Sequence, residues 1–365
     1  MSTTRTSTVV IGGGQAGLVT SYRLSKAGRD HVVLDASERT GDAWRKRWDS
    51  LCLFTPARYS GLDGMPFPAP SFHKPTKDEM AEYLEAYAER FDLPVRHGVQ
   101  VEAVTKDGDR FVVTAGADRF VADEVVVATG AFNDPYTPAF ADELDPAITQ
   151  IHSCRYSNPS QLEPGPVLIV GAGNSGADIA IETSKLHPTI VAGRHPGHVP
   201  FRIDSFKARF LVRVVRNAGQ HVLTWRTPIG RKVLPKLASG GWPLVRVKPK
   251  DLVAAGVQRV GRVEGVVDRK PQLDDGQVVD VANVIWCTGF RPNHAWVGLD
   301  AFDDNGHPVH ERGISTNVDG LYFVGMAFQY AATSDTITGV RRDGAHVVRH
   351  IVSRKRASDA ATAAA

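Results

Sequence analysis

The chain has 365 residues, enough for two domains, and its 42% hydrophobic content is typical of a globular protein that buries two cores. A formal net charge of +3 is small for this length, and no uninterrupted block of Lys and Arg appears, so we expect no nucleic-acid partner. No stretch approaches the roughly 18 consecutive apolar residues that a membrane-spanning helix needs, and the polar residues before Val9 do not resemble a secretory signal. The expected compartment is the cytoplasm.

The first predicted elements are a strand, a glycine-rich turn and a helix. The β-branched run 8–11 leads into Gly12-Gly13-Gly14-Gln15-Ala16-Gly17 and a helix-like segment, 18–27. A second apolar strand, 31–34, ends in Asp35, 18 residues after Gly17, close to the roughly 20-residue spacing of a dinucleotide-binding fingerprint. Gly12 would allow the tight turn, Gly14 the approach of a pyrophosphate, and Gly17 close helix packing. The phosphates would bind at the helix N-terminus.

The same unit recurs in the middle of the chain. The apolar run 167–170 leads into Gly171-Ala172-Gly173-Asn174-Ser175-Gly176, then a helix-like segment, 177–186, and a strand, 189–192. The offset is 159 residues (171 minus 12), and at this offset Ala128-Thr129-Gly130 corresponds to Cys287-Thr288-Gly289. One glycine-rich turn can serve packing alone. Its repetition together with the threonine-glycine segments predicts two domains of one fold.

One position differs between the two units in a chemically informative way. Asp35 corresponds to Arg194 at the same offset. A carboxylate suits a free ribose 2′-hydroxyl, as in FAD, whereas a guanidinium suits the 2′-phosphate of NADPH. The first unit therefore predicts an FAD site and the second an NADPH site. The alternative is that Arg194 is a surface arginine, and His195 and Arg202 could share the phosphate or be solvated.

Segment 199–250 contains no fingerprint. Phe206, Phe210 and Val214 recur at helical spacing among several basic residues, as in a basic amphipathic helix. Such a helix can lie on a membrane surface or cover a substrate channel, so 203–216 is a candidate for peripheral membrane contact. The alternative is a lid packed on the NADPH domain, with its charged face in solvent and its tryptophans in a lid core.

A buried-type strand followed by glycine, 319–325, lies beyond the second unit and needs a sheet to join. The simplest topology returns the chain to the first domain, which predicts an α/β fold of two Rossmann-like domains, with the NADPH domain inserted into the FAD domain. We expect the FAD domain at 1–155 and 290–355, the NADPH domain with its lid-like segment at 156–289, and a disordered tail at 356–365.

The three cysteines, Cys52, Cys154 and Cys287, are far apart in the sequence. They form neither a Cys-x-x-Cys redox pair nor a zinc-ligand pattern, so we expect reduced, structural cysteines and no metal site.

With these residues the chain resembles the flavin-containing monooxygenase family from residue 9 to residue 351, on the side of its bacterial and YUCCA-like branches. The most specific match is His152 with Tyr156, ahead of the second fingerprint, which resembles the linker signature F-x-G-x-x-x-H-x-x-x-Y. Pro146 and Ile148 stand where the family has phenylalanine and glycine. The family places this histidine in the domain linker, so a structural role stands beside an acid or base role.

Two further segments carry the resemblance. Gly41-Asp42-Ala43-Trp44 is similar to the family's Gly-Gly-x-Trp turn, and 48–68 is similar to a stretch beside the flavin ring. Animal-type members have an asparagine there that is linked to stabilising the oxygenated flavin, whereas this chain has Phe54-Thr55-Pro56. The final segment, 321–350, resembles the family's last flavin-contacting segment, with amides near residue 339 facing the flavin.

The repeat and the resemblance together imply the cofactor-binding residues. For FAD they are Gly12, Gly14, Gly17, Asp35, Trp44, Thr129, Gly130 and Gly325. For NADPH they are Gly171, Gly173, Asn174, Ser175, Gly176, Arg194 and Thr288. The candidates for a catalytic side chain are His152 and Thr55.

The implied reaction is cofactor chemistry. NADPH would reduce the flavin, dioxygen would add at C4a, and the resulting (hydro)peroxyflavin would insert one oxygen atom into a sulfur, nitrogen or carbonyl centre of a small organic substrate. The alternatives are an NADPH oxidase or flavin reductase that oxygenates no substrate, and a non-catalytic flavoprotein. The missing Cys-x-x-Cys pair opposes a disulfide reductase.

Overall fold

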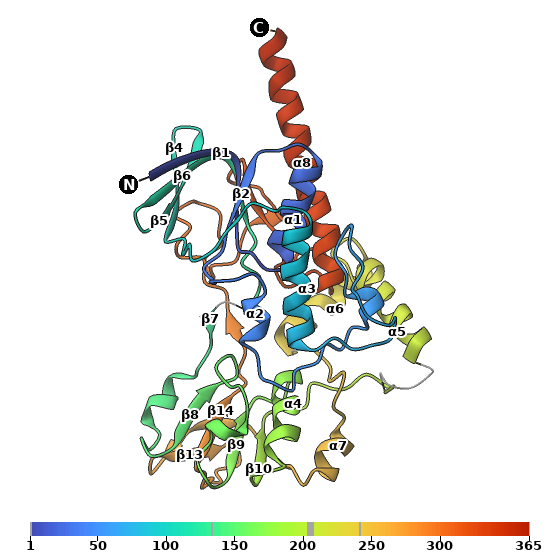
Figure 1. The fold of residues 1–365 in the computed structure, drawn as a ribbon. Coiled ribbons are helices and arrows are strands. Elements are labelled where there is room, and N and C mark those ends of the chain that lie inside the picture. The colour runs from blue at the N-terminus through green and yellow to red at the C-terminus, as the bar shows by residue number, and fades with distance from the viewer. Residues whose placement is uncertain (1, 133, 203–207, 241, 365) are drawn as a thin grey trace.

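The computed structural model describes residues 2–132, 134–202, 208–240 and 242–364. Its two lobes each contain a mainly parallel sheet, and Figure 1 shows them one above the other. In the first lobe β1 (Ser2–Ile11) pairs in parallel with β2 (His31–Leu34) on one side and β6 (Asp118–Val127) on the other. The parallel part is completed by β3 (Val95–Arg96) beside β2 and β18 (Leu321–Phe323) beside β6. Antiparallel strands extend it: β4 (Ala103–Asp107), β5 (Arg110–Ala115), β16 (His310–Glu311) and β17 (Ile314–Ser315).

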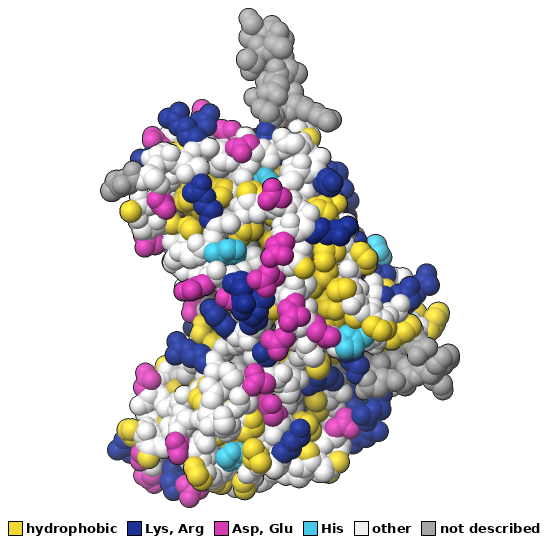
Figure 2. All heavy atoms as spheres, viewed as in Figure 1, with side chains coloured by type: hydrophobic (Ala, Val, Ile, Leu, Met, Phe, Trp, Pro, Cys, Tyr) yellow, Lys and Arg dark blue, Asp and Glu magenta, His cyan; other side chains and the backbone are white. Residues whose placement is uncertain are grey.

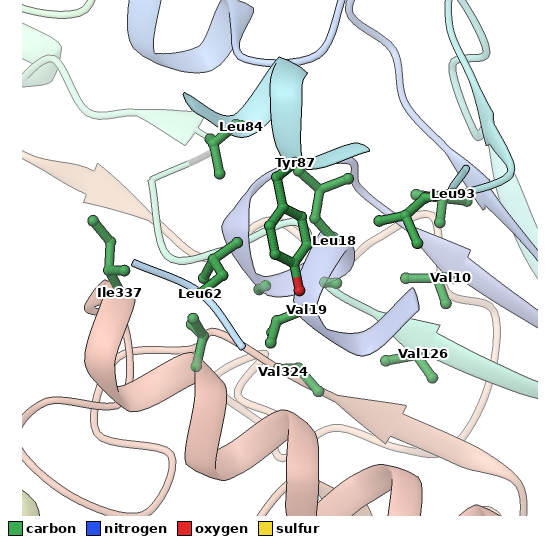
Figure 3. Packing of buried hydrophobic residues seen from close by; sticks show 14 of the residues in the cluster. Val10, Leu18, Val19, Leu62, Leu84, Tyr87, Leu93, Val126, Val324 and Ile337 are labelled. Carbon is green, nitrogen blue, oxygen red and sulfur yellow. The ribbon is translucent and has the colours of Figure 1, made fainter. Parts of the chain in front are cut away.

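The two faces of this sheet bury different cores, because successive side chains of a strand point to opposite faces. Val10, Val126 and Val324 lie in one core with α1 (Gln15–Lys26), α3 (Lys77–Arg90) and α8 (Ile337–Ala364) (Figure 3). Val9 and Val125 lie in the other core, with Phe111 of β5. Three helices therefore cover one face, and their N-terminal ends can meet the loops that leave the strands. The short α2 (Asp42–Arg45) follows β2.

The second lobe contains a five-stranded parallel sheet in the order β11-β10-β9-β14-β8. Its strands are β8 (Thr149–His152), β9 (Val167–Val170), β10 (Thr189–Ala192), β11 (Gln258–Val260) and β14 (Asn283–Trp286). Two helices, α4 (Asn174–Thr183) and α7 (Pro249–Ala254), contribute to the core on one face. The hairpin of β12 (Val263–Val267) and β13 (Lys270–Leu273) contributes to the core on the other.

The chain passes between the lobes through two short paired strands, β7 (Asp134–Pro135) and β15 (Phe290–Arg291) (Figure 1). Strand β18 then joins the first sheet beside β6, as the sequence predicted for 319–325. The predicted α/β fold with one dinucleotide-binding lobe inserted into the other is confirmed. The boundary expected at 155/156 was wrong, because β8 already pairs with β14 in the second sheet and the chain crosses earlier, at β7. Pairing of strands so far apart in the chain is not visible in the sequence. The boundary at 289/290 remains our proposal.

Segment 208–240 forms a lid of α5 (Ala208–Asn217), a π-helical turn (Ala218–Val222) and α6 (Pro228–Gly240). Its contacts are with the first lobe: Thr224 forms a β-bridge with Ala331, and the Trp225 indole N–H donates to the Phe328 carbonyl at 2.6 Å. The prediction of a lid packed on the NADPH domain was therefore wrong for 208–240, whereas Leu244 and Val247 of the predicted segment do lie in the core of the second lobe. Hydrogen-bond partners far along the chain decide where a lid packs, and helical periodicity does not report them. Residues 203–207, which the amphipathic pattern included, lie outside the described residues.

The lid tryptophans are not core residues as the sequence suggested, since 41% of Trp225 and 38% of Trp242 are exposed. Trp242 stacks on Phe328 with ring centroids 6.1 Å apart.

The C-terminal helix also departs from the prediction. Residues 356–364, expected to form a disordered tail, continue α8 as far as Ala364. Alanine is the strongest helix former, and a helix already nucleated by buried packing extends at low cost through an alanine-rich sequence. No helix within the described residues is long and apolar enough to cross a membrane.

Candidate functional site

The first glycine-rich turn joins β1 to α1 and has a backbone that other residues would strain. Gly12 has φ of +107°, and a Cβ on it would lie 2.7 Å from the Ala128 carbonyl oxygen. A Cβ on Gly17 would lie 1.8 Å from the Gly12 carbonyl oxygen, whereas a Cβ on Gly14 would meet nothing within 4 Å. Gly12 and Gly17 are thus required by packing of the protein itself. Gly14 instead borders open space at the start of the helix.

The N-terminus of α1 is free to receive an anion. Its N-cap, Gly14, provides no side-chain hydrogen bond, and no acidic residue lies in the first turn. By contrast, α3 begins with a complete capping box of Thr76 and Glu79. The first amides of a helix need partners, and the helix dipole favours a negative one. The residues present therefore fit the pyrophosphate of a dinucleotide.

Asp35, at the end of β2, has a second role that the sequence did not reveal. Its carboxylate accepts from the Gly13 amide and from the Ser37 amide, each at 2.7 Å. These bonds fix the carboxylate against the glycine-rich turn, and each oxygen keeps a further acceptor site for the ribose hydroxyls that the fingerprint predicts. A side chain on Gly13 would displace Asp35, since the Cβ would lie 2.2 Å from the carboxylate.

The other predicted FAD residues lie at the same edge of the sheet. Thr129 and Gly130 directly follow β6, and Gly325 follows β18, the neighbouring strand. A Cβ on Gly325 would lie 2.7 Å from Ala16 and 4.0 Å from Gly130, so the three loop segments converge. The Trp44 indole N–H donates to the Gln15 side-chain oxygen of α1 at 3.4 Å.

The second turn repeats the geometry of the first. Gly171 has φ of +116°, and a Cβ there would lie 2.2 Å from the Cys287 carbonyl oxygen. A Cβ on Gly176 would lie 1.9 Å from the Gly171 carbonyl, while a Cβ on Gly173 would meet nothing within 4 Å. Gly173 caps α4 without a side-chain bond, and no acid lies in the first turn. This second helix start therefore also fits a pyrophosphate.

Three further predicted NADPH residues lie at this turn or near it. Asn174 binds the returning lid segment, with its amide nitrogen donating to the Pro243 carbonyl at 3.1 Å and its oxygen accepting from the Val245 amide at 2.9 Å. Ser175 is the second residue of α4. The Thr288 hydroxyl donates to the Tyr136 carbonyl, which ties the two crossings together.

Arg194 is exposed just beyond the end of β10 and forms no hydrogen bond or ion pair among the described residues. Arg259, on β11, pairs in register with Val191 of β10. Burial, followed by the nearby charge of Arg259, lowers the pKa of His195. Two arginines and a histidine therefore surround the end of β10. The sequence missed Arg259 because its position opposite β10 depends on sheet pairing.

His152 joins the lobes at the crossing. Its Nε2 lies 3.1 Å from the Gly289 carbonyl and its Nδ1 accepts from the Cys154 amide at 3.2 Å, so both ring nitrogens are engaged. A carbonyl only accepts, and Nε2 therefore carries the proton. Burial lowers the pKa of His152, which favours the neutral ring. Its neighbour in the signature, Tyr156, is fully buried and donates to Glu182 at 3.1 Å.

Thr55 and its neighbours occupy a loop before the 3₁₀ helix Ala57–Tyr59. The Thr55 side chain is partly buried and its carbonyl accepts from the Ser60 hydroxyl at 3.1 Å, while 47% of Phe54 is exposed. No side chain in 54–56 can donate an amide hydrogen bond.

Asp335, two residues before α8, was not predicted from the sequence. Burial raises its pKa to about 6.

Comparison with known proteins identifies relatives along nearly the whole chain. The family model described as pyridine nucleotide-disulphide oxidoreductase matches residues 9–197. An uncharacterized oxidoreductase, CzcO-like, of Geobacillus kaustophilus is 38% identical over 94% of this chain and 98% of that protein. Indole-3-pyruvate monooxygenase YUCCA1 of rice is 28% identical, over 96% of this chain and 92% of that one. A mutant of the flavin monooxygenase from Stenotrophomonas maltophilia superposes with a TM-score of 0.78 at 30% identity, covering 96% of this chain and 99% of its own.

Proposed function

Because this chain belongs to the flavin-containing monooxygenase family of pyridine nucleotide-disulphide oxidoreductases, we propose that it is an NADPH-oxidising monooxygenase of small organic molecules. Membership makes it a flavin-dependent oxidoreductase that binds FAD and a nicotinamide dinucleotide. The observation that supports the finer proposal is the pair of uncapped helix starts, at Gly14 and Gly173, one in each lobe. Two such cradles in one chain provide for two dinucleotides.

The coenzyme is NADPH. Arg194 stands at the position where the first unit has a carboxylate, with His195 next to it in the chain and the charge of Arg259 close to His195. A 2′-phosphate bound by one such guanidinium gains about 1.5–3 kcal/mol, which is roughly a tenfold to hundredfold preference over NADH. Arg194→Ala should remove most of that preference in kcat/KM, whereas Lys185→Ala, at an exposed site beyond α4, should keep it. An unchanged ratio in Arg194→Ala would assign the phosphate to other residues.

The substrate site is covered by the lid. The bound flavin supplies electron transfer from NADPH and the activation of dioxygen. The chain's own residues bind and orient both dinucleotides, and α5, the π-helical turn and α6 cover the first lobe where its loops meet α8. Excluding water there protects the activated oxygen from loss as peroxide. We propose a sulfur, nitrogen or carbonyl centre as the site of oxygenation.

One observation favours a second candidate, an NADPH oxidase. Residues Phe54-Thr55-Pro56 supply no side-chain amide at the place where animal-type relatives of the family have asparagine. Without that donor the enzyme would release hydrogen peroxide when no substrate is bound.

Labelled dioxygen distinguishes the two. The FAD-loaded enzyme is turned over with NADPH and ¹⁸O₂ in the presence of a panel of sulfides, amines and ketones, and the products are analysed by mass spectrometry. A monooxygenase gives one ¹⁸O atom per product molecule, and rapid mixing of the reduced enzyme with oxygen shows a transient flavin absorbance. Single-phase reoxidation with stoichiometric peroxide across the whole panel would leave the NADPH oxidase.

A further inference from the structure

An arginine-lined cavity lies between the lid and the helices of the first lobe. Its volume is about 340 Å³, and its walls come from α1, α8, the loop at Asp63 and the end of α5 with the π-helical turn. The arginines that line it are Arg23, Arg216, Arg341, Arg342 and Arg349. The cavity is not lined by the glycine-rich turns, Asp35 or Arg194, although its α8 residues belong to the segment 321–350 that resembles the family's last flavin-contacting segment.

The positive charge of the cavity is only partly compensated. Asp63 is the one acidic residue in its lining, and it is shared between Arg23 at 2.5 Å and Arg341 at 2.9 Å. Arg342 pairs with Asp343 at 2.8 Å. Five arginines less two carboxylates leave a charge of +3. Arg349 is exposed and has neither a hydrogen bond nor an ion pair within the described ranges.

Two of these arginines also have donors without acceptors. The Nε atoms of Arg23 and Arg216 are buried, and neither has a hydrogen-bond partner among the described residues. Each of these two guanidinium groups therefore carries a donor that the described residues leave unpaired, which is costly. Arg216 is fixed in place, because its guanidinium lies over the Tyr59 ring at 4.5 Å and donates to Asn217 at 2.7 Å.

The arginine cavity adjoins a groove whose exposed lining atoms are mostly apolar. The groove runs between α1 and α8, has a volume of about 990 Å³ and shares Arg23, Ala345 and Arg349 with the cavity. Its remaining lining consists of Tyr22, Ala27, Val348 and Val352 together with Lys26, His346, His350 and Ser353. A ligand that enters from the groove would place an apolar part there and an anionic part among the arginines.

We propose that the arginine cavity binds the phosphate group of an amphiphilic ligand whose apolar chain lies in the groove between α1 and α8. A phosphate presents three acceptor oxygens to guanidinium groups that donate in fixed planar forks. The ligand also connects the lid to the first lobe, because Arg216 belongs to α5 and Arg341 to α8. Gln220 already links the two, donating to the Thr338 carbonyl at 3.3 Å and accepting from Arg342 at 2.8 Å. A bound phosphate would therefore strengthen lid docking.

Exposed apolar residues on the lid make a lipid one source of such a phosphate. Phe210 of α5 is 70% exposed and Ile229 of α6 is 57% exposed. Figure 2 shows hydrophobic side chains on this face beside Lys and Arg at the right edge, where Figure 1 places α5. A soluble phosphorylated amphiphile is the other source, and it would use the same arginines.

The binding test uses the FAD-loaded enzyme with saturating NADP⁺, so that both dinucleotide sites are filled, at constant ionic strength. Hexyl phosphate and inorganic phosphate are titrated calorimetrically. One equivalent of each should bind, with hexyl phosphate at least tenfold tighter. Arg216→Gln and Arg349→Gln should each weaken both ligands by tenfold or more, while Arg213→Gln, an exposed neighbour on α5 outside the cavity, should not. Val352→Asn should weaken only hexyl phosphate.

If Arg216→Gln loses FAD, Arg349→Gln still tests the proposal, because Arg349 is exposed and makes no hydrogen bond or ion pair within the described residues. Sedimentation with vesicles that contain phosphatidic acid, but not with phosphatidylcholine vesicles, that is lost in Arg349→Gln would identify a membrane lipid. Binding of hexyl phosphate without sedimentation would identify a soluble ligand. The proposal would be overturned if neither hexyl phosphate nor the vesicles bound. It would also be overturned if Arg349→Gln and the wild type bound equally, or if hexyl phosphate and inorganic phosphate bound with equal affinity.

Discussion

Gly14 and Gly17 stand three residues apart in one turn, but a side chain would meet different surroundings at each. Gly14→Leu should leave the protein folded without FAD, because the new side chain occupies open space that the pyrophosphate needs. Gly17→Ala should destabilise the protein itself by about 1–3 kcal/mol, since its Cβ would overlap the Gly12 carbonyl. The FAD-to-protein absorbance ratio and thermal unfolding of the apoprotein measure the two effects. A fully FAD-loaded Gly14→Leu protein would contradict the assignment of this turn to the FAD pyrophosphate.

The stability of the folded protein should depend on pH through Asp335. Its pKa is raised to about 6 in the folded state, above about 3.9 in an unfolded chain. Its neutral form is favoured by folding, so its contribution to stability is fully present below about pH 4 and lost as pH rises through 6. Asp335→Asn should therefore raise Tm at pH 8 and change it little at pH 4, with up to about 3 kcal/mol at stake. Asp304→Asn, at an exposed acid, is the control. An equal change in Tm at both pH values would contradict this account.

At the scale of elements, backbone and side-chain hydrogen bonds hold the lid on the first lobe, and one of them can be removed without removing a ring. Trp225→Phe keeps the ring but removes the N–H that donates to the Phe328 carbonyl. Losing one hydrogen bond costs about 0.5–1.5 kcal/mol, which raises the open fraction of the lid roughly twofold to tenfold. We expect more peroxide per NADPH consumed, with unchanged FAD content. Coupling measured with a peroxide assay checks this, and Trp296→Phe, whose N–H donates to Asn293, is the matched control. Equal coupling in both variants would mean that this bond does not hold the lid closed.

Two variants of His152, which lies at the crossing between the lobes, distinguish a structural role of this residue from a catalytic one. His152→Gln retains a donor that can reach the Gly289 carbonyl, whereas His152→Ala does not. A positioning role predicts that Gln restores most of the kcat/KM for NADPH lost in Ala, and that the pH profile of kcat in both variants is that of the wild type. If the two variants were equally inactive, or lost the same ionisation from the pH profile, His152 would be an acid or base.

At the scale of the whole molecule, the sequence predicted most of the fold. The strands expected at 31–34, 167–170 and 189–192 have those bounds in the structure. Short apolar runs followed by glycine leave few alternatives, and the overlaps at Gly12 and Gly171 show why the repeat needs glycine at both positions. The repeat therefore carried topological information that a single fingerprint lacks.

The candidate site was less predictable, for a physical reason. Glycine positions follow from local backbone geometry, and the sequence displays them directly. Arg259 reaches the end of β10 only through pairing of β10 with β11, and the lid reaches the first lobe through bonds such as that from Trp225 to Phe328. Such contacts join residues far apart in the chain and have no sequence period.

The insertion described above also fixes the order in which the lobes can be completed during synthesis. All five strands of the second sheet lie between residues 149 and 286, so that lobe can finish as soon as the ribosome has made them. The first sheet must wait for β18, whose Leu321 pairs with Val125 across 196 residues (321 minus 125). Until then the edge of β6 and the face of α1 that packs on α8 are uncovered. A nascent chain that stalls before residue 321 would thus combine a finished inner lobe with an aggregation-prone outer one, which is where a chaperone would be needed.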